Sequence, residues 1–185
     1  SEYYGGSDFE YVKGIVTDQN GGIYVCGYTQ STDFRVTSSA IQKSNNGGTD
    51  GFVMRFDAFG SVIWSSYFGG DNYDALYSIS IDSSSLRQPK IILCGTTQST
   101  NLQNLHTFVS DTLSGNSDIV LLSLSNDGIA NWAKLYGGLN LDEATAVCVD
   151  RDNHLIMTGF TGSDVITSHF PLLGGFQSTF GGYGD

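Results

Sequence analysis

Apolar residues along this chain fall into short runs that are separated by clusters of Gly, Asn, Asp and Ser. Such runs are too short for most helices and are typical of strands joined by tight turns. In the first third of the chain they predict β-strands at residues 12–18, 23–29, 51–57 and 62–68. Gly and Asn between the runs supply the positive φ angles that hairpin turns need.

The pattern repeats along the chain, which is the most informative feature of the sequence. A Gly-Gly pair at residues 5–6 returns at 69–70, 64 residues later, and at 137–138 after a further 68 residues. The spacing lengthens within residues 83–90, where we expect a longer hairpin loop. Each repeat is therefore predicted to form one antiparallel four-stranded meander, with strands a, b, c and d in chain order.

Strand b indicates how these meanders are arranged. Its first two copies read Ile-Tyr-Val-Cys at 23–26 and Ile-Ile-Leu-Cys at 91–94, so both of its faces are apolar. A strand of this kind is covered on both sides, as in a sheet that stacks between neighbouring sheets around an axis. The sequence thus predicts an all-β fold made of β-propeller blades. One glycine position in strand b, Gly27, Gly95 and Gly159, predicts close backbone approach.

The chain is expected to hold about two and a half to three blades, as a fragment of one propeller domain. Residues 1–4 are expected to be strand d of a preceding blade, residues 5–68 blade 1 and residues 69–136 blade 2. Residues 137–185 are expected to hold strands a and b of blade 3 with a long loop. Since propellers close with about four to eight blades, we expect other blades, from the same or other chains, as partners.

The repeat resembles the SBBP-type β-propeller repeat family over essentially the whole chain. The segments that carry the resemblance are Tyr-Phe-Gly-Gly at 67–70, the apolar segment ending in Asp at 79–82, Cys-Gly-Tyr-Thr at 26–29 and Gly-Gly-Thr-Asp-Gly-Phe-Val at 47–53. The insertion Arg-Gln-Pro at 87–89 departs from it. The resemblance implies a multi-bladed propeller, often in a secreted or cell-surface protein, without a shared catalytic motif.

Charge and motifs narrow the functional classes. A formal net charge of −11 repels phosphate backbones, so we expect no nucleic-acid partner. No apolar stretch approaches the roughly 18 residues of a membrane helix, so no membrane insertion is expected. No HExxH, GxSxG or P-loop motif is present. We therefore expect no catalytic residues, no metal and no cofactor. Residues 18–22 and 150–153 faintly resemble a calcium loop but lack its late Glu, so we expect both to be a–b hairpin turns.

The loops that follow strand b are long and share one end of the blades with the d–a loops, so this end is the candidate binding face. The candidate binding residues there are Glu10, Asp33, Phe34, Asp74, Asp142 and Glu143. Glu10, Asp74 and Asp142 are repeat equivalents, which also fits a structural function, with each carboxylate accepting backbone N–H groups from the next blade's turn. Apolar loop residues such as Phe34 are expected to pack on the blades, or else to contact a partner.

These features favour a non-enzymatic scaffold that binds a protein or a polysaccharide, in a secreted or cell-surface location. One alternative is a glycan-active hydrolase or lyase that uses carboxylates on the long-loop face. Another is a structural subunit of a filament or coat.

Overall fold

The computed structural model describes residues 3–85, 88–102 and 113–164 of the chain, and all regular structure in these ranges is antiparallel β-sheet. Blade 1 is the sheet β1-β2-β3-β4, and blade 2 is the sheet β5-β6-β7-β8. Blade 3 is the pair β9 and β10. The prediction of four-stranded meanders that make β-propeller blades is confirmed. The strands are β1 Glu10–Thr17, β2 Ile23–Thr29, β3 Asp50–Phe56, β4 Val62–Phe68, β5 Asp74–Asp82, β6 Lys90–Thr97, β7 Asp118–Ser125, β8 Ala130–Tyr136, β9 Asp142–Val149 and β10 Leu155–Thr161.

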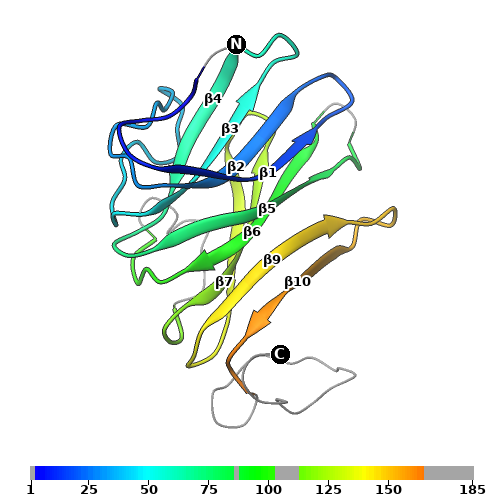
Figure 1. Cartoon of the computed structure of the whole chain (residues 1–185). Helices are drawn as coiled ribbons and strands as arrows, with labels where there is room; N and C mark the ends of the chain where they lie inside the picture. Colours follow the sequence, from blue (N-terminus) through cyan, green and yellow to red (C-terminus); the bar gives the residue numbers. More distant parts are fainter. Residues whose placement is uncertain (1–2, 86–87, 103–112, 165–185) are drawn as a thin grey trace.

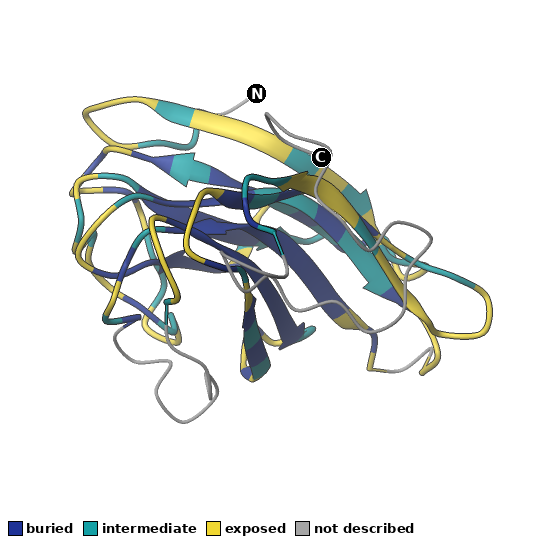
Figure 2. Ribbon diagram, turned by 90° about the horizontal axis from the view of Figure 1, so that it is seen from below, coloured by how far each residue is buried: buried dark blue, intermediate teal, exposed yellow. Residues whose placement is uncertain are grey.

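The three sheets stack face to face in chain order, as Figure 1 shows by the succession of blue, green and gold strands. Their first strands converge, because β5 contacts both β1 and β9. Blade 2 is thus the covered sheet, and Figure 2 shows that buried residues dominate the middle of the molecule.

Both faces of strand β6 are apolar because each face packs against a different neighbouring blade. Ile91 and Leu93 belong to the core shared with blade 1, whereas Ile92 and Cys94 belong to the core shared with blade 3. All four side chains are at most 2% exposed. A fully buried Ile or Leu side chain contributes about 2 kcal/mol relative to an exposed one, so both interfaces stabilise this strand.

The same repeat position loses this cover in blade 3. Tyr24 in β2 and Ile92 in β6 are 0% and 2% exposed, whereas their equivalent Ile156 in β10 is 53% exposed. The difference follows from position, because Tyr24 and Ile92 face a following sheet and Ile156 does not. Apolar side chains of blade 3 are therefore left in contact with solvent.

A β-bulge recurs in the first strand of every blade. The pairing registers skip Lys13 in β1, Tyr77 in β5 and Thr145 in β9. Next to each bulge lies the repeated glycine of strand b. A β-carbon on Gly27 or Gly159 would collide with the carbonyl oxygen of Tyr11 or Glu143, respectively, so the predicted close approach is confirmed.

Backbone bridges join successive blades at the long-loop end. Thr49, just before β3, forms a parallel bridge with Tyr73, just before β5, and the Asp74 N–H donates to the Thr49 carbonyl at 2.9 Å. Ser117 and Leu141 repeat this bridge one blade later. Each loop that ends in a third strand is thus tied to the segment that opens the next blade.

The beginning of the chain differs from the expectation. Of the expected strand d at residues 1–4, residues 1–2 lie outside the described residues, and Tyr3 and Tyr4 are not in a strand. Tyr4 instead packs edge-on against Phe56 of β3, with 5.0 Å between the ring centroids. Tyr4 thus packs on the apolar face of blade 1 that points away from blade 2. Within the described ranges, we also found no helix with the length and hydropathy to cross a bilayer.

Candidate functional site on the long-loop face

The repeated carboxylates sit at the start of the first strand of each blade and bond the surrounding loops. Asp74 Oδ2 accepts hydrogen bonds from the Gly70 N–H and the Ser99 hydroxyl, both at 2.7 Å. Asp142 Oδ2 does the same with the Gly138 N–H at 2.8 Å and the Ser163 hydroxyl at 2.9 Å. Each carboxylate therefore clamps its own d–a turn to the loop that leaves strand b.

Glu10 makes the same bonds from a longer side chain. Its Oε1 accepts from the Ser31 hydroxyl at 2.6 Å, from the Thr29 hydroxyl at 2.8 Å and from the Gly6 N–H at 3.2 Å. The structural function considered from the sequence therefore has a geometric basis in all three copies. The donors differ from the expectation, because they belong to the same repeat and not to the next blade's turn.

Burial separates these acids from solvent. Asp74 and Asp142 are both 0% exposed. Burial raises the pKa of Asp74 to about 6, against the opposing effect of the hydroxyl and N–H groups that bond it. A carboxyl group that is enclosed and already bonded in this way is a poor contact for an external ligand.

A second repeated acid, which sequence reasoning did not include in the site, lies where the third strands begin. Asp50 Oδ2 accepts from Gln42 Nε2 at 2.6 Å, and Gln42 Oε1 in turn accepts from the Gly69 N–H at 2.8 Å. Burial raises the pKa of Asp118, its equivalent in blade 2, to about 6. The repeat spacing held the signal, since Asp50 and Asp118 are 68 residues apart.

Asp33 and Phe34 have separate environments although they are adjacent. Asp33 is exposed, and its Oδ1 accepts from the Ser7 N–H and hydroxyl at 2.8 and 3.0 Å. Phe34 is 4% exposed and packs between Phe52 and Tyr67, with ring centroids 4.9 and 5.7 Å away. Phe34 thus anchors the loop onto blade 1, as the packing interpretation expected. Phe108, Val109, Phe170, Leu172 and Leu173 of the equivalent loops lie outside the described residues.

Glu143 lies in β9, where it pairs with Phe160 of β10. Sequence reasoning missed a group of aromatic residues on blades 1 and 2. We define the aromatic cluster as Phe9, Tyr11, Tyr28, Tyr73 and Tyr77. Tyr11 stacks on Tyr28 with 4.9 Å between the ring centroids, and Phe9 stacks on Tyr11 at 6.2 Å. Tyr28 also contacts Tyr73 and Tyr77 of blade 2 at 6.0 and 6.3 Å. The cluster therefore spans the junction between the innermost strands of two blades.

The aromatic cluster carries polar groups of its own and contacts one cation. Lys13 Nζ lies 5.4 Å from the centroid of the Tyr28 ring and 6.0 Å from that of Tyr77, within cation–π range. The hydroxyl oxygens of Tyr73 and Tyr77 are 3.2 Å apart. Burial, together with Tyr73 and the negative charge of Glu143, raises the pKa of the Tyr77 hydroxyl above its ordinary value. Both hydroxyls thus remain protonated donors at neutral pH.

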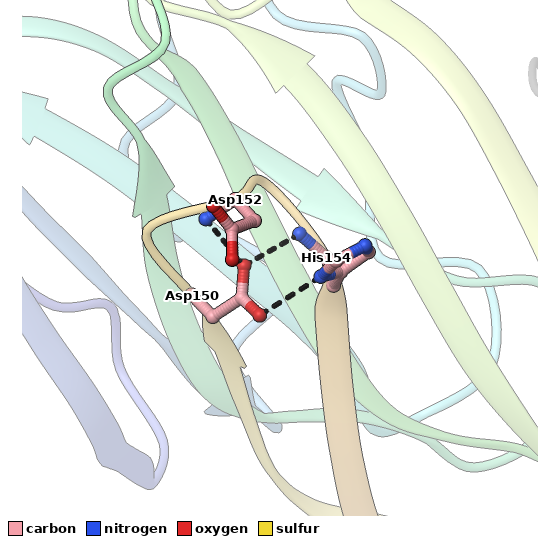
Figure 3. Close-up of side chains that lie close together, drawn as sticks. All are labelled: Asp150, Asp152 and His154. Carbon is pink, nitrogen blue, oxygen red and sulfur yellow. Dashed lines mark hydrogen bonds and ion pairs between the residues drawn. The ribbon is translucent and has the colours of Figure 1, made fainter.

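Asp150, Asp152 and His154 also gather oxygen and nitrogen atoms, with one ligand atom of each residue within 4.8 Å of the others (Figure 3). Asp150 Oδ1 accepts from the Asp152 and His154 N–H groups, both at 2.8 Å. Asp18 Oδ1 forms the same pair of bonds with Asn20 and Gly22, where no such cluster exists. The arrangement is therefore that of the a–b hairpin turn. His106 and His169 lie outside the described residues.

The face of blade 1 that points away from blade 2 carries a hollow of about 330 Å³, whose lining includes Tyr4, Arg35, Met54 and Val62. It lies where a preceding sheet would pack, and Val36 and Thr37 of the b–c loop also line it.

A comparison with protein-family models agrees with this architecture. Residues 3–35 match the model of SBBP, described as a beta-propeller repeat. The matched segment covers the first Gly-Gly turn, β1, β2 and the start of the following loop. Among curated proteins, none matches this chain significantly.

Proposed function

We propose that the chain is a non-enzymatic β-propeller scaffold that binds a protein or a polysaccharide on its long-loop face. The proposal places it in a secreted or cell-surface protein. The supporting observation is the contrast on this face between the repeated acids and the aromatic rings. Asp74 and Asp142 are buried and bonded to the scaffold, whereas Phe9 and Tyr11 are 63% and 44% exposed.

The same observation disfavours a glycan hydrolase or lyase. Such an enzyme needs two carboxyl groups that reach the bond to be cleaved. The three repeated acids instead accept hydrogen bonds from turns of their own blades, and two of them are inaccessible to solvent. Catalysis by these groups would require the loops that they clamp to open.

A solution experiment separates these functions. The purified chain is incubated with soluble β-glucan, xylan and pectin, while binding is followed by affinity electrophoresis and cleavage by release of reducing ends. Protein partners are sought in parallel by cross-linking to proteins of an outer cell surface. Binding without cleavage supports the scaffold. Cleavage that Asp142→Asn abolishes would overturn it in favour of the enzyme.

A structural subunit of a larger assembly is the second candidate, and one observation favours it. Leu155, Ile156 and Phe160 of β10 are 38%, 53% and 38% exposed, and within the described residues only β9 pairs with this strand. Exposed apolar side chains on an edge strand favour pairing with another sheet. Electron microscopy of the concentrated chain tests it, because ordered filaments or closed rings are expected only if copies complete one another.

A further inference from the structure

The aromatic cluster occupies positions where the three repeats differ in residue class. Positions that pack blades together keep their character: 24, 92 and 156 hold Tyr, Ile and Ile, and 26, 94 and 158 hold Cys, Cys and Thr. Most positions of the cluster and that of Lys13 do not: 11, 75 and 143 hold Tyr, Ala and Glu; 13, 77 and 145 hold Lys, Tyr and Thr; 28, 96 and 160 hold Tyr, Thr and Phe. Positions 9, 73 and 141 stay large and apolar or aromatic, as Phe, Tyr and Leu. Blades 1 and 2 are both covered by a following sheet, so packing alone would favour similar residues in these two repeats, and the differences between Tyr11 and Ala75 and between Lys13 and Tyr77 indicate another requirement.

The backbone explains why these positions are free to differ. Lys13 and Tyr77 are the bulge residues of β1 and β5, which have no cross-strand partner in the register. A bulge re-aims the side chain that it carries, and bulges are common next to binding sites. Since β1, β5 and β9 are the converging innermost strands, the bulge residues lie where the blades approach the propeller axis.

The rings leave part of their surface available. Phe9, at the end of the Phe9–Tyr11–Tyr28 stack, is 63% exposed, and Tyr11 is 44% exposed. Tyr28, Tyr73 and Tyr77 are half-buried, and Tyr28 contacts the other two. The stack holds the outer rings in one orientation, so a ligand would contact them without much loss of side-chain freedom.

The chemistry of the cluster matches a sugar ring. A pyranose has apolar C–H faces and a rim of hydroxyl groups. Aromatic faces are electron-rich and attract such C–H groups, and the Lys13 ammonium and the Tyr73 and Tyr77 hydroxyls can bond the rim. Glu143 lies in β9, the first strand of blade 3, which contacts β5, and its negative charge is among the causes that raise the pKa of Tyr73 and Tyr77.

The charges of the cluster and of the whole chain distinguish between neutral and anionic glycans as ligands. Only Lys13 contributes a positive charge to the contacts described for this cluster, Glu143 opposes it, and the whole chain carries −11. A polyanionic glycan would be repelled by that field. We propose that the aromatic cluster, with Lys13, is a binding site for a neutral polysaccharide; this inference rests on the proposed scaffold function and names its ligand class and its residues.

The test measures binding of the 185-residue chain to soluble β-glucan, xylan and galactomannan, with alginate as an anionic glycan. Affinity electrophoresis reports the dissociation constant, and far-UV circular dichroism confirms that each variant is folded. Phe9→Ala and Tyr11→Ala each remove one exposed ring of the stack. Phe59→Ala is the matched control, because Phe59 is 95% exposed on the β3–β4 turn and belongs to no contact of the cluster.

We expect at least one neutral polysaccharide to bind. Tyr11→Ala should weaken this binding about tenfold, as expected for loss of one stacking contact. Tyr11→Phe should retain most of the affinity, because the ring remains, and Phe59→Ala should leave it unchanged. Alginate should bind more weakly than the neutral glycans.

Several outcomes would overturn the proposal. Equal effects of the Tyr11→Ala and Phe59→Ala variants would show that the cluster is not the site. Absence of glycan binding, together with cross-linking to a surface protein that Tyr11→Ala reduces and Phe59→Ala does not, would assign the cluster to a protein ligand. In that last case the scaffold function would survive, whereas binding of neither glycans nor proteins would remove both proposals.

Discussion

The α-carbon of Gly95 in β6 lies directly against the backbone carbonyl oxygen of Ala75 in β5, so that a β-carbon has no room there. The contact is between two backbones, and neither can move aside as a flexible side chain would. We expect Gly95→Ala to lower the free energy of unfolding by about 3 kcal/mol, since the core must shift to admit a methyl group. Urea unfolding followed by circular dichroism measures the loss.

Gly162→Ala is the control for this substitution. A β-carbon at Gly162 would lie 3.3 Å from the Leu141 carbonyl oxygen, which is tight but requires only a small adjustment. Its effect should be under about 1 kcal/mol. Equal losses at Gly95 and Gly162 would contradict the argument from close approach.

The raised pKa of Asp74 predicts that the free energy of unfolding depends on pH. Burial raises the pKa of this carboxyl from its ordinary value of 3.8 to about 6 in the folded chain. Between these two values the folded state binds a proton that the unfolded state has released. The contribution of Asp74 to the free energy of unfolding is therefore greatest below about pH 4 and is lost as pH rises through 6.

The Asp74→Asn variant keeps an oxygen acceptor but does not titrate. Its urea midpoint should change less than that of the original chain as pH rises from 4 to 7. Asp152→Asn, at an exposed turn position, should follow the original chain. If the difference between the Asp74→Asn and original midpoints stays constant with pH, the carboxyl does not titrate in this window.

The three cysteines should react at different rates with a thiol reagent. Cys26 and Cys94 are buried and free, and burial raises the pKa of both thiols to about 12. Cys148 is free and exposed. Ellman's reagent should therefore detect one thiol in the folded chain and all three in guanidinium chloride, and Cys148→Ser should remove the fast signal. Rapid reaction of Cys26 or Cys94 would show that the blades separate readily.

Ile156 should control self-association of the isolated chain. It is 53% exposed at a position that is covered by a following sheet in blades 1 and 2. The chain is expected to associate as its concentration rises, and Ile156→Lys should lower the apparent mass in light scattering toward that of one chain. The same substitution at Ile129, which is 64% exposed before β8, should have little effect. A monomeric original chain at all concentrations would contradict the prediction.

Much of the fold could be predicted because the repeats supply two or three copies of each position, which can be compared with one another. The ends of β2 and β4 agree with the sequence expectation, and the two apolar faces of β6 correctly predicted a sheet covered on both sides. Gly95 and its equivalents were also assigned their correct physical cause. These features depend on local periodicity, which a single sequence records.

The candidate site was less predictable, because its contacts join residues that are far apart in the chain. Asp74 was found by its recurrence, but its bond to Ser99 depends on how the long loop leaves β6. The aromatic cluster depends on bulges at Lys13 and Tyr77 that shift the alternation of side chains. Apolar periodicity does not show such a shift, so these residues were not brought together from sequence alone.

The bridges from Thr49 to Tyr73 and from Ser117 to Leu141 have a consequence for how such a gene can change. Each bridge connects one repeat only to its immediate successor, through backbone atoms that almost any residue supplies. Duplicating or deleting a whole unit would therefore recreate the same junction at the new boundary. Natural variants of different circumference could arise by unequal recombination, while differences at the bulge positions let each new copy acquire its own surface.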